Sequence, residues 1–346
     1  MIKVLLLGVI MSMLNANEYP TTDHYKEGKF LNEEITYVKV DFSKLGSMIS
    51  AFMFDKSKEA TPTKEIPIVK LNSEMIDAMH NNSVIRLSHS TLLLKLDGNY
   101  FLTDPLFSER ASPVSFMGPK RFHPSPINIE GLPTIKGVIL SHDHYDHFDY
   151  EALQKLDDKV VKFYTPLGVG KRLIEMGIDA NKVVEQDWWE SINVDGVELI
   201  TTPAQHFSGR GVFDSDTILW ASWVIKTDTV NLFFSGDSGY FTGFKSIAKK
   251  YGPFDMTFIE VGAYNTLWRE IHMLPYKSVQ AHIDLDGAVM FPVHNGTFDL
   301  ALHSWYEPFD KVLQSAQEKA VTIRFPKMGE ELSLLKPKET SLWWRE

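Results

Sequence analysis

The segment Gly137-Val-Ile-Leu-Ser-His-Asp-His-Tyr-Asp-His147 runs from an apolar stretch straight into a cluster of three histidines and a carboxylate. The apolar stretch predicts a buried strand, and a tight loop after it would let the polar side chains converge. His142 and His144 are two residues apart, so in an extended segment their side chains lie on the same side, which suits one metal ion. Asp146 and His147 are adjacent, which suits a second metal ion. Imidazole and carboxylate are ligands for zinc and other divalent first-row metals. The pattern H-x-H-x-D-H therefore predicts a two-metal site.

Three further candidate ligands each follow a predicted strand. A single histidine or aspartate in such a position is usually structural, but three of them downstream of H-x-H-x-D-H indicate ligands that complete the site. They are His206 after the strand predicted at 197–202, Asp237 after 230–234, and His294 after 288–293.

Composition limits the remaining possibilities. The chain contains no cysteine, which excludes disulfides, thiolate nucleophiles and Cys-type zinc sites, so any metal is held by His and carboxylate groups. The formal net charge of -10 disfavours nucleic acid as a partner, because an acidic chain does not attract a phosphate backbone at long range. Apolar residues make up 44% and charged residues 23%, as in a soluble globular protein that can bury a core.

From residue 84 onward the chain reads as one large domain, which we place at residues 84–346. Short apolar or β-branched runs predict strands at 84–87, 91–96 and 100–104, with Asp97-Gly98 as a hairpin turn. Further on, predicted strands, among them 217–227, alternate with helices expected at 150–155, 168–176, 244–251, 276–285 and 305–319. This order predicts a layered α/β protein with sheets inside and helices outside.

Residues 1–16 begin with a short basic segment, continue with an apolar stretch of about 11 residues and end at Ala16, which is typical of a secretory signal peptide. The alternative is a buried or membrane-facing N-terminal helix. With cleavage after Ala16 we expect an exported protein, periplasmic or secreted, with membrane association as a further option.

Residues 17–83 form a polar N-terminal extension with one apolar helical stripe, made of Leu45, Met48, Ile49, Phe52 and Met53. The stripe either packs on the main domain or contacts lipid or an apolar substrate. In the second case the extension would serve as a lid or a peripheral membrane contact.

The order H-x-H-x-D-H, His, Asp, His resembles the metallo-β-lactamase superfamily. Longer segments resemble, more specifically, N-acylphosphatidylethanolamine-hydrolysing phospholipase D. The similarity runs from about residue 85 to residue 303 and is carried by residues 101–113, 117–122, 142–150, 187–190, 234–240, 251–255 and 261–264.

The resemblance implies a four-layer αββα sandwich with two zinc ions at one edge of the sheets. It implies that one zinc is held by His142, His144 and His206, the other by Asp146, His147 and His294, and that Asp237 bridges both. Other divalent first-row metals would suit the same ligands.

The resemblance also points to residues for the reaction itself. Asp146 counts among the catalytic residues as well as the ligands. Tyr145 and His272 match family positions near the reacting phosphate, where each either donates a hydrogen bond to a phosphoryl oxygen or only packs.

Two other polar residues lie before the metal-binding loop. Asp104 either orients a ligand histidine by hydrogen bonding or is an ordinary strand-ending aspartate. His89 matches a family position between glycine and alanine. Ser88 and Ser90 depart from that pattern, so His89 belongs either to the site or to the core.

The implied function is a zinc-dependent phosphodiesterase of the phospholipase D type, acting on an N-acylphosphatidylethanolamine-like phospholipid. Two cations about 3.5–4 Å apart would share a water, and the resulting metal-bridging hydroxide would attack phosphorus in line. The alternatives are a metallo-lactonase or sugar-phosphate hydrolase of the same fold, a nuclease, which the acidic charge opposes, and a non-catalytic metal-binding protein. The sequence makes no prediction of the oligomeric state.

Overall fold

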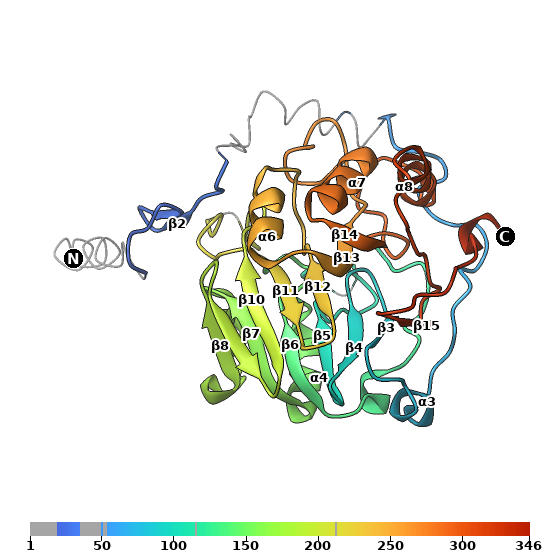
Figure 1. The fold of residues 1–346 in the computed structure, drawn as a ribbon. Helices are drawn as coiled ribbons and strands as arrows, with labels where there is room; N and C mark the ends of the chain where they lie inside the picture. The colour runs from blue at the N-terminus through green and yellow to red at the C-terminus, as the bar shows by residue number, and fades with distance from the viewer. Residues whose placement is uncertain (1–18, 35–49, 51–53, 115, 212) are drawn as a thin grey trace.

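The computed structural model describes residues 19–34, 50, 54–114, 116–211 and 213–346. It contains two large β-sheets packed together, with helices outside them (Figure 1). This is the αββα sandwich that we expected, so the predicted fold class is confirmed. The predicted signal peptide and all five residues of the apolar stripe lie outside the described residues.

The first sheet has seven strands in the order β15-β3-β4-β5-β6-β7-β8, and β5 to β8 run parallel. The antiparallel hairpin between β4 and β5 turns at Asp97 and Gly98, whose φ angles of 45° and 78° have the sign that a tight hairpin turn needs. The strands are β3 (Ser83–Arg86), β4 (Leu92–Leu96), β5 (Asn99–Thr103), β6 (Ile135–Ile139), β7 (Val160–Pro166), β8 (Val183–Gln186) and β15 (Glu331–Ser333).

The second sheet has six strands in the order β14-β13-β12-β11-β10-β9. Strands β9 to β12 are antiparallel, and β12, β13 and β14 are parallel. The strands are β9 (Ser191–Val194), β10 (Val197–Thr202), β11 (Ser222–Lys226), β12 (Asn231–Phe234), β13 (Phe254–Glu260) and β14 (Gly287–Val293).

Alternation of side chains along the strands divides the core into layers, because successive residues of a strand point to opposite faces. In β4, Leu92 and Leu94 pack with Trp223 and Phe258 in the core between the two sheets. Leu93 belongs instead to the core that the seven-stranded sheet forms with its helices. Both faces of β4 are therefore buried, as its continuous apolar run requires.

Helices cover both outer faces of the sandwich (Figure 1). Helices α3, α4 and α5 pack on the seven-stranded sheet, for example through Leu153, and α6, α7 and α8 pack on the other, for example through Val279. The helices are α3 (Ser73–Asp77), α4 (Tyr150–Leu156), α5 (Val169–Glu175), α6 (Gly243–Tyr251), α7 (Pro275–Asp284) and α8 (Glu307–Glu318). The helices predicted after residue 137 begin and end within two residues of these bounds.

Several strands differ from the expectation. The strand predicted at 217–227 begins only at Ser222, because Trp220 instead packs in an aromatic cluster with the N-terminal segment. Strands β8, β9 and β15 were not predicted, because all are short edge strands that are mostly half-buried or exposed and lack a strong apolar pattern.

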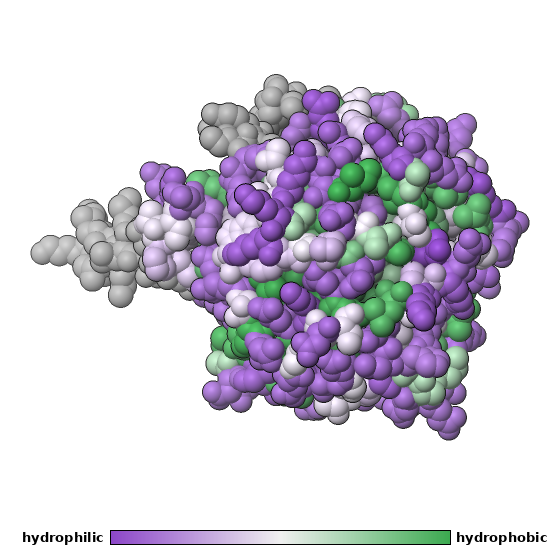
Figure 2. All heavy atoms as spheres, in the orientation of Figure 1, coloured by the Kyte–Doolittle hydropathy of each residue, from purple (hydrophilic) through white to green (hydrophobic). Residues whose placement is uncertain are grey.

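The described part of the N-terminal extension begins with residues 19–34, here called the N-terminal arm. The arm forms a small hairpin of β1 (Tyr25–Lys26) and β2 (Lys29–Phe30), and Tyr25 and Phe30 are buried with Trp188 and Trp220 of the main domain. Within the described ranges, no helix has the length and apolar character that crossing a bilayer needs. The face shown in Figure 2 is largely hydrophilic, with small separate hydrophobic areas.

Candidate metal centre

The loops after β6, β10, β12 and β14 meet at one place, where they bring the predicted ligands together. Three groups of potential ligand atoms result, and within each group the atoms lie within 4.8 Å of one another. The first group is His142, His144, His206 and Asp237, and the second is His89, Asp146, His147 and His294. The third group, Asp237, Glu260, His272 and His294, shares Asp237 with the first and His294 with the second. All the histidines and aspartates predicted as ligands are present in the first two groups.

The first group contains three converging ring nitrogens. His144 Nδ1 lies 2.9 Å from His142 Nε2 and 3.2 Å from His206 Nε2. Asp237 Oδ2 lies 3.9 Å from His142 Nε2. Ligands bound to one tetrahedral zinc at about 2.0–2.1 Å lie about 3.3 Å apart, so this donor set fits a single cation.

The second group likewise combines three histidines with one carboxylate, Asp146. Asp146 Oδ2 lies 3.3 Å from His294 Nε2 and 3.7 Å from His147 Nε2. Asp237 also reaches this group, with Oδ1 3.1 Å from His147 Nε2 and Oδ2 3.1 Å from His294 Nε2. Asp237 therefore lies between the two groups, where a bridging ligand is needed.

Close contacts require a glycine at the position before Asp237. Gly236 has φ of 54°, and a Cβ on it would lie 2.6 Å from Ser141 Cβ and 2.9 Å from the Ala221 carbonyl oxygen. Only glycine lets this loop pass against the loop of Ser141. Asp237 is thereby brought beside the ligands of the other sheet.

Hydrogen bonds on the far side of the rings fix which nitrogen faces the centre. His147 Nδ1 donates to Asp104 Oδ2 at 2.7 Å, and His206 Nδ1 donates to the Ile271 carbonyl oxygen at 3.0 Å. The Ser141 hydroxyl donates to Asp104 Oδ2 at 2.7 Å and lies 2.9 Å from His142 Nδ1. This geometry favours the interpretation of Asp104 as a residue that orients a ligand.

Burial and neighbouring charges shift the pKa of several candidate ligands. Burial lowers the pKa of His142 and His206 well below the usual value, so both imidazoles are neutral and each can offer a nitrogen lone pair to a metal. Burial alone would raise the pKa of Asp237, but His147 and His294 hold it well below its usual range. Since Asp237 and Asp146 raise the pKa of His147 against the effect of burial, a metal bound there must displace a proton.

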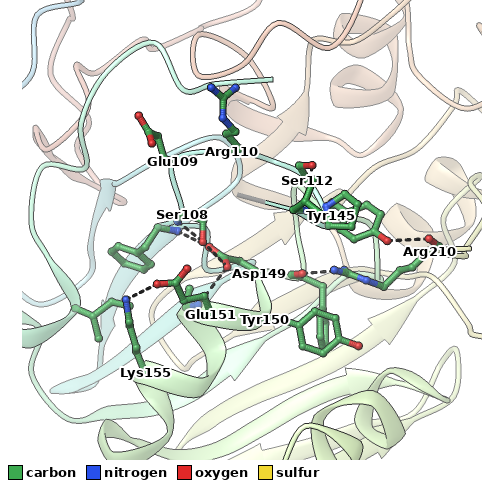
Figure 3. Close-up of a pocket in the computed structure, with 16 residues that line it drawn as sticks. Ser108, Glu109, Arg110, Ser112, Tyr145, Asp149, Tyr150, Glu151, Lys155 and Arg210 are labelled. Carbon is green, nitrogen blue, oxygen red and sulfur yellow. Dashed lines mark hydrogen bonds and ion pairs between the residues drawn. The ribbon is translucent and has the colours of Figure 1, made fainter. Parts of the chain in front are cut away.

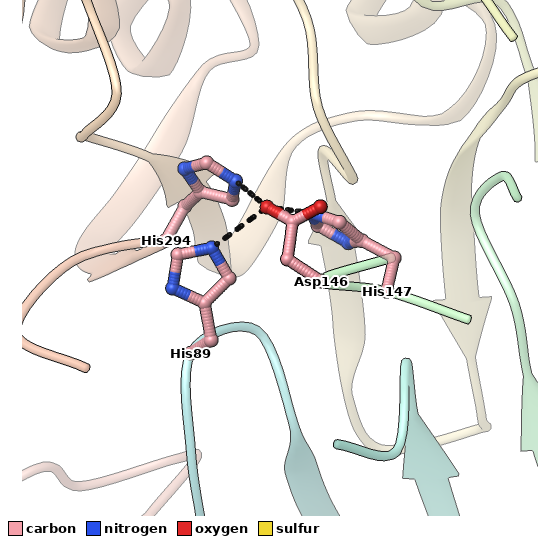
Figure 4. A group of neighbouring side chains, drawn as sticks. All are labelled: His89, Asp146, His147 and His294. Atoms are coloured by element: carbon pink, nitrogen blue, oxygen red, sulfur yellow. Dashed lines mark hydrogen bonds and ion pairs between the residues drawn. The ribbon is translucent and has the colours of Figure 1, made fainter. Parts of the chain in front are cut away.

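His89 joins the second group, although the sequence left its role open (Figure 4). It is only 1% exposed, and its Nε2 lies 3.4 Å from Asp146 Oδ2. Its ring centroid lies 3.9 Å from that of His294, and neither ring nitrogen has a hydrogen-bond partner of good geometry among the described residues. A buried imidazole with both nitrogens unpaired is costly unless a cation or Asp146 engages it.

His272 lies beside the first two groups. Its ring centroid is 5.3 Å from that of His206 and 5.2 Å from that of His294, and its Nδ1 donates to Glu260 Oε2 at 3.3 Å. Glu260 is fully buried at the end of β13 and also accepts the Met273 N–H at 2.6 Å. The sequence analysis missed Glu260, although a carboxylate that ends a buried strand was the available signal.

Tyr145 lines a cavity of about 450 Å³, where its hydroxyl points towards Arg210 (Figure 3). Its hydroxyl donates to the Arg210 carbonyl oxygen at 2.8 Å, and the Arg210 guanidinium lies 3.8 Å from the ring centroid. Among the described residues, no hydrogen bond joins this hydroxyl to a candidate ligand. Its role as a donor to phosphate stays a prediction, and this hydrogen bond would have to break.

Arg86 is a second residue that sequence reasoning missed. Its buried guanidinium donates to the carbonyl oxygens of Ser88, His89, Pro292 and Asn295 and to Asn295 Oδ1, at 2.6–3.2 Å. It thereby ties the loop of His89 to the loop of His294. Burial lowers its pKa to about 9, and an arginine inside an otherwise apolar strand was the signal for a special role.

Comparison with known proteins agrees with this geometry. The family described as "Beta-lactamase superfamily domain" matches residues 99–295. An uncharacterized protein of Mycobacterium tuberculosis is 38% identical over 327 residues, which cover 93% of this chain and 87% of that protein. N-acyl-phosphatidylethanolamine-hydrolyzing phospholipase D 1 of Caenorhabditis elegans is 36% identical over 247 residues, or 67% of this chain and 69% of that protein.

Solved structures share the fold at low identity. An isothiocyanate hydrolase from gut bacteria of Delia radicum has a TM-score of 0.57 at 23% identity, covering 72% of this chain and 98% of its own. The metallo hydrolase Igni18 of Ignicoccus hospitalis has a TM-score of 0.56 at 19% identity, covering 72% of this chain and 97% of Igni18. With its histidine and aspartate clusters at the loop edge, the chain belongs to the metallo-β-lactamase superfamily of metal-dependent hydrolases and, within it, to the N-acylphosphatidylethanolamine-hydrolysing phospholipase D-like family.

Proposed function

We propose that this protein is a zinc-dependent phosphodiesterase that hydrolyses an N-acylphosphatidylethanolamine-like phospholipid on the phosphatidate side of the head group. The observation that carries the proposal is the pair of ligand clusters that share Asp237. The first cluster would hold one zinc through His142, His144 and His206, and the second would hold another through Asp146, His147 and His294. When bound, the two ions would lower the pKa of a water and offset charge on the phosphoryl oxygens.

The chain's own residues would position the reacting groups. Asp237 would set the separation of the two sites, since its two oxygens reach ligands of both. His272, whose Nδ1 donates to Glu260, would donate from Nε2 to a phosphoryl oxygen as an imidazolium, in which both ring nitrogens carry a proton. Asp104 would keep His147 turned towards the second site, since it accepts the Nδ1–H. These contacts are in place before any substrate binds, which lowers the reorganisation needed in the transition state.

The proposal of a lipid substrate rests on similarity to the relative from Caenorhabditis elegans, which is named as a hydrolase of N-acylphosphatidylethanolamine. The solved structures are less than 25% identical and support the fold alone, so they do not favour a lactone or sugar-phosphate substrate. We therefore retain these substrates, and a metal-binding protein without activity, as alternatives for the test.

The decisive experiment is product analysis with zinc-loaded and zinc-free protein. The substrates would be an N-acylphosphatidylethanolamine and a phosphatidylcholine, each in mixed micelles, and a lactone and a sugar phosphate, each in solution. We expect an N-acylethanolamine and phosphatidate from the first substrate, and only with metal. Lactone opening without phosphodiester cleavage would replace the proposal by the lactonase, and no turnover of any substrate would favour a binding protein.

The metal content can be tested separately. Elemental analysis of the purified chain should approach two zinc or similar ions per molecule. A value near zero after reconstitution would refute the metal site whatever the activity.

We also propose export and contact with a membrane, both from the sequence. Mass spectrometry of the native protein should find a chain that begins near Asn17. Replacing Ile49 and Phe52 by serine should weaken binding to vesicles and turnover of long-chain lipid, and spare a small soluble diester. Retention of residues 1–16 in a cytoplasmic fraction would contradict export, and equal loss with both substrates would contradict lipid docking.

A further inference from the structure

The main chain of His206 lies in a loop beyond the hydrogen-bond ladder of its sheet. The ladder between β10 and β11 ends with the pair Thr202 and Ser222, four residues before His206. His206 is nevertheless fully buried. Buried main-chain N–H and C=O groups need partners, and the two sheets do not provide them at this position.

The partner is Asn32 of the N-terminal arm. The His206 N–H donates to Asn32 Oδ1 at 3.0 Å, and Asn32 Nδ2 donates to the His206 carbonyl oxygen at 2.8 Å. One carboxamide thus pairs with both main-chain groups of a candidate ligand, as a neighbouring strand would. Trp220 Nε1 donates to the same Oδ1 at 2.9 Å, which fixes the orientation of the amide.

Contacts on both sides of Asn32 hold the arm in place. Before it, the Phe30 N–H donates to the Asp216 carbonyl oxygen at 2.7 Å, and His24 Nε2 lies 2.7 Å from Asp187 Oδ1. After it, Glu34 Oε1 accepts the Thr242 N–H at 2.7 Å and the Thr242 hydroxyl at 2.5 Å. Asn32 is therefore fixed between two anchor points and does not depend on a single contact.

We infer that Asn32 is a positioning residue of the first metal site, and that the N-terminal arm is part of that site. The His206 ring is held at Nδ1 by Ile271 and at its main chain by Asn32, which leaves Nε2 directed at His144 Nδ1, 3.2 Å away. Without Asn32, the main chain of His206 loses both partners, and the loop can move away from the other ligands. The inference rests on the proposed two-metal site and adds a determinant that lies outside the domain predicted at 84–346.

The test uses cadmium-113 NMR of the full chain after removal of other metals. Titration with ¹¹³Cd²⁺ should give two resonances, of which His144→Ala should remove one and His294→Ala the other. In Asn32→Ala, we expect the resonance that is sensitive to His144→Ala to need about 10–100-fold more cadmium, the usual effect of losing a residue that supports a ligand. The other resonance should stay within about twofold of the unmutated protein.

A second variant and a control separate positioning from folding. Asn32→Asp keeps the size and the acceptor, but turns a carboxylate oxygen towards the His206 carbonyl oxygen, so it should weaken the same resonance. Asn181→Ala, at an exposed residue of a short turn, should change neither resonance. Circular dichroism of the metal-free variants checks that they are folded.

The outcomes are distinguishable. If the unmutated protein binds no cadmium or zinc, the proposed function fails and the inference fails with it. If it shows two resonances and both Asn32 variants retain both at unchanged affinity, only the inference is overturned. Equal weakening of both resonances would also overturn it, because it would mean a general loss of structure.

Discussion

Replacing Asp104 by alanine should destabilise the protein and weaken the second metal site together. The Asp104 carboxylate is fully buried and accepts three hydrogen bonds. They come from the Ser141 N–H at 2.8 Å, the Ser141 hydroxyl at 2.7 Å and the His147 Nδ1–H at 2.7 Å. The side chain thus links the end of β5 to the loop that carries the H-x-H-x-D-H ligands.

The size of the effect follows from these three donors. A buried donor that loses its acceptor costs about 1–3 kcal/mol, so three of them cost about 3–6 kcal/mol after partial relaxation. Asp104 also has φ of 34°, a region that costs alanine about 1 kcal/mol more. Since domains have a free energy of unfolding of about 5–15 kcal/mol, the loss is a large part of the total.

The assay is urea unfolding of the zinc-free protein, followed by circular dichroism. Asp104→Asn keeps one acceptor and should lose about half as much stability as Asp104→Ala. Asp158→Ala, at an exposed aspartate, should stay within about 0.5 kcal/mol of the unmutated protein. If Asp104→Ala also stays within that range, the three hydrogen bonds do not stabilise the loop and the reasoning is wrong.

Three other predictions concern single histidines and the bridging aspartate. Asp237→Ala should abolish metal-dependent turnover, because both sites lose a ligand. His80→Ala changes a side chain that is 86% exposed and should leave turnover unchanged. Equal activities of the two variants would contradict the role of Asp237 as a bridge. His89→Ala should lower the zinc content from about two towards one after dialysis, measured by elemental analysis, because the second site loses a neighbour of Asp146; an unchanged content would assign His89 to the core. Burial lowers the pKa of His282 to about 4 from about 6.5 unfolded, so its neutral form contributes stability above pH 6.5 that is lost as the pH falls towards 4. Urea unfolding should show a loss of about 2 kcal/mol from pH 7.5 to pH 5 that is absent in His282→Gln, and the same loss in both proteins would refute this cause.

The candidate metal ligands could be predicted from the sequence for a local reason. His142, His144, Asp146 and His147 lie within six residues, so their chemistry is visible without any knowledge of the fold. The distant candidates could be found because a polar residue at the end of an apolar run marks the edge of a sheet. The same rule would have found Glu260, which also ends a buried strand.

Other parts of the site depend on contacts that leave no local pattern. Asn32 supports His206 from 174 positions away, and Arg86 joins the loops of His89 and His294 across 209 positions to Asn295. No periodicity or spacing in the sequence indicates such pairs, because most of the partners are main-chain groups that every residue carries. Tyr145 shows the reverse case, since it stands among the ligands in the sequence but turns its hydroxyl to Arg210.

The sequence by itself therefore determined the kind of protein, its layered fold and the residues able to bind metal, since these follow from residue chemistry and from apolar patterning along single strands. Only the tertiary structure decided that His89 joins the second group, which residues orient each imidazole, and that the N-terminal arm supports the first site. The physical reason is that both sheets contribute loops to one edge. Distances between those loops are set by packing between the sheets and are not encoded in any one segment.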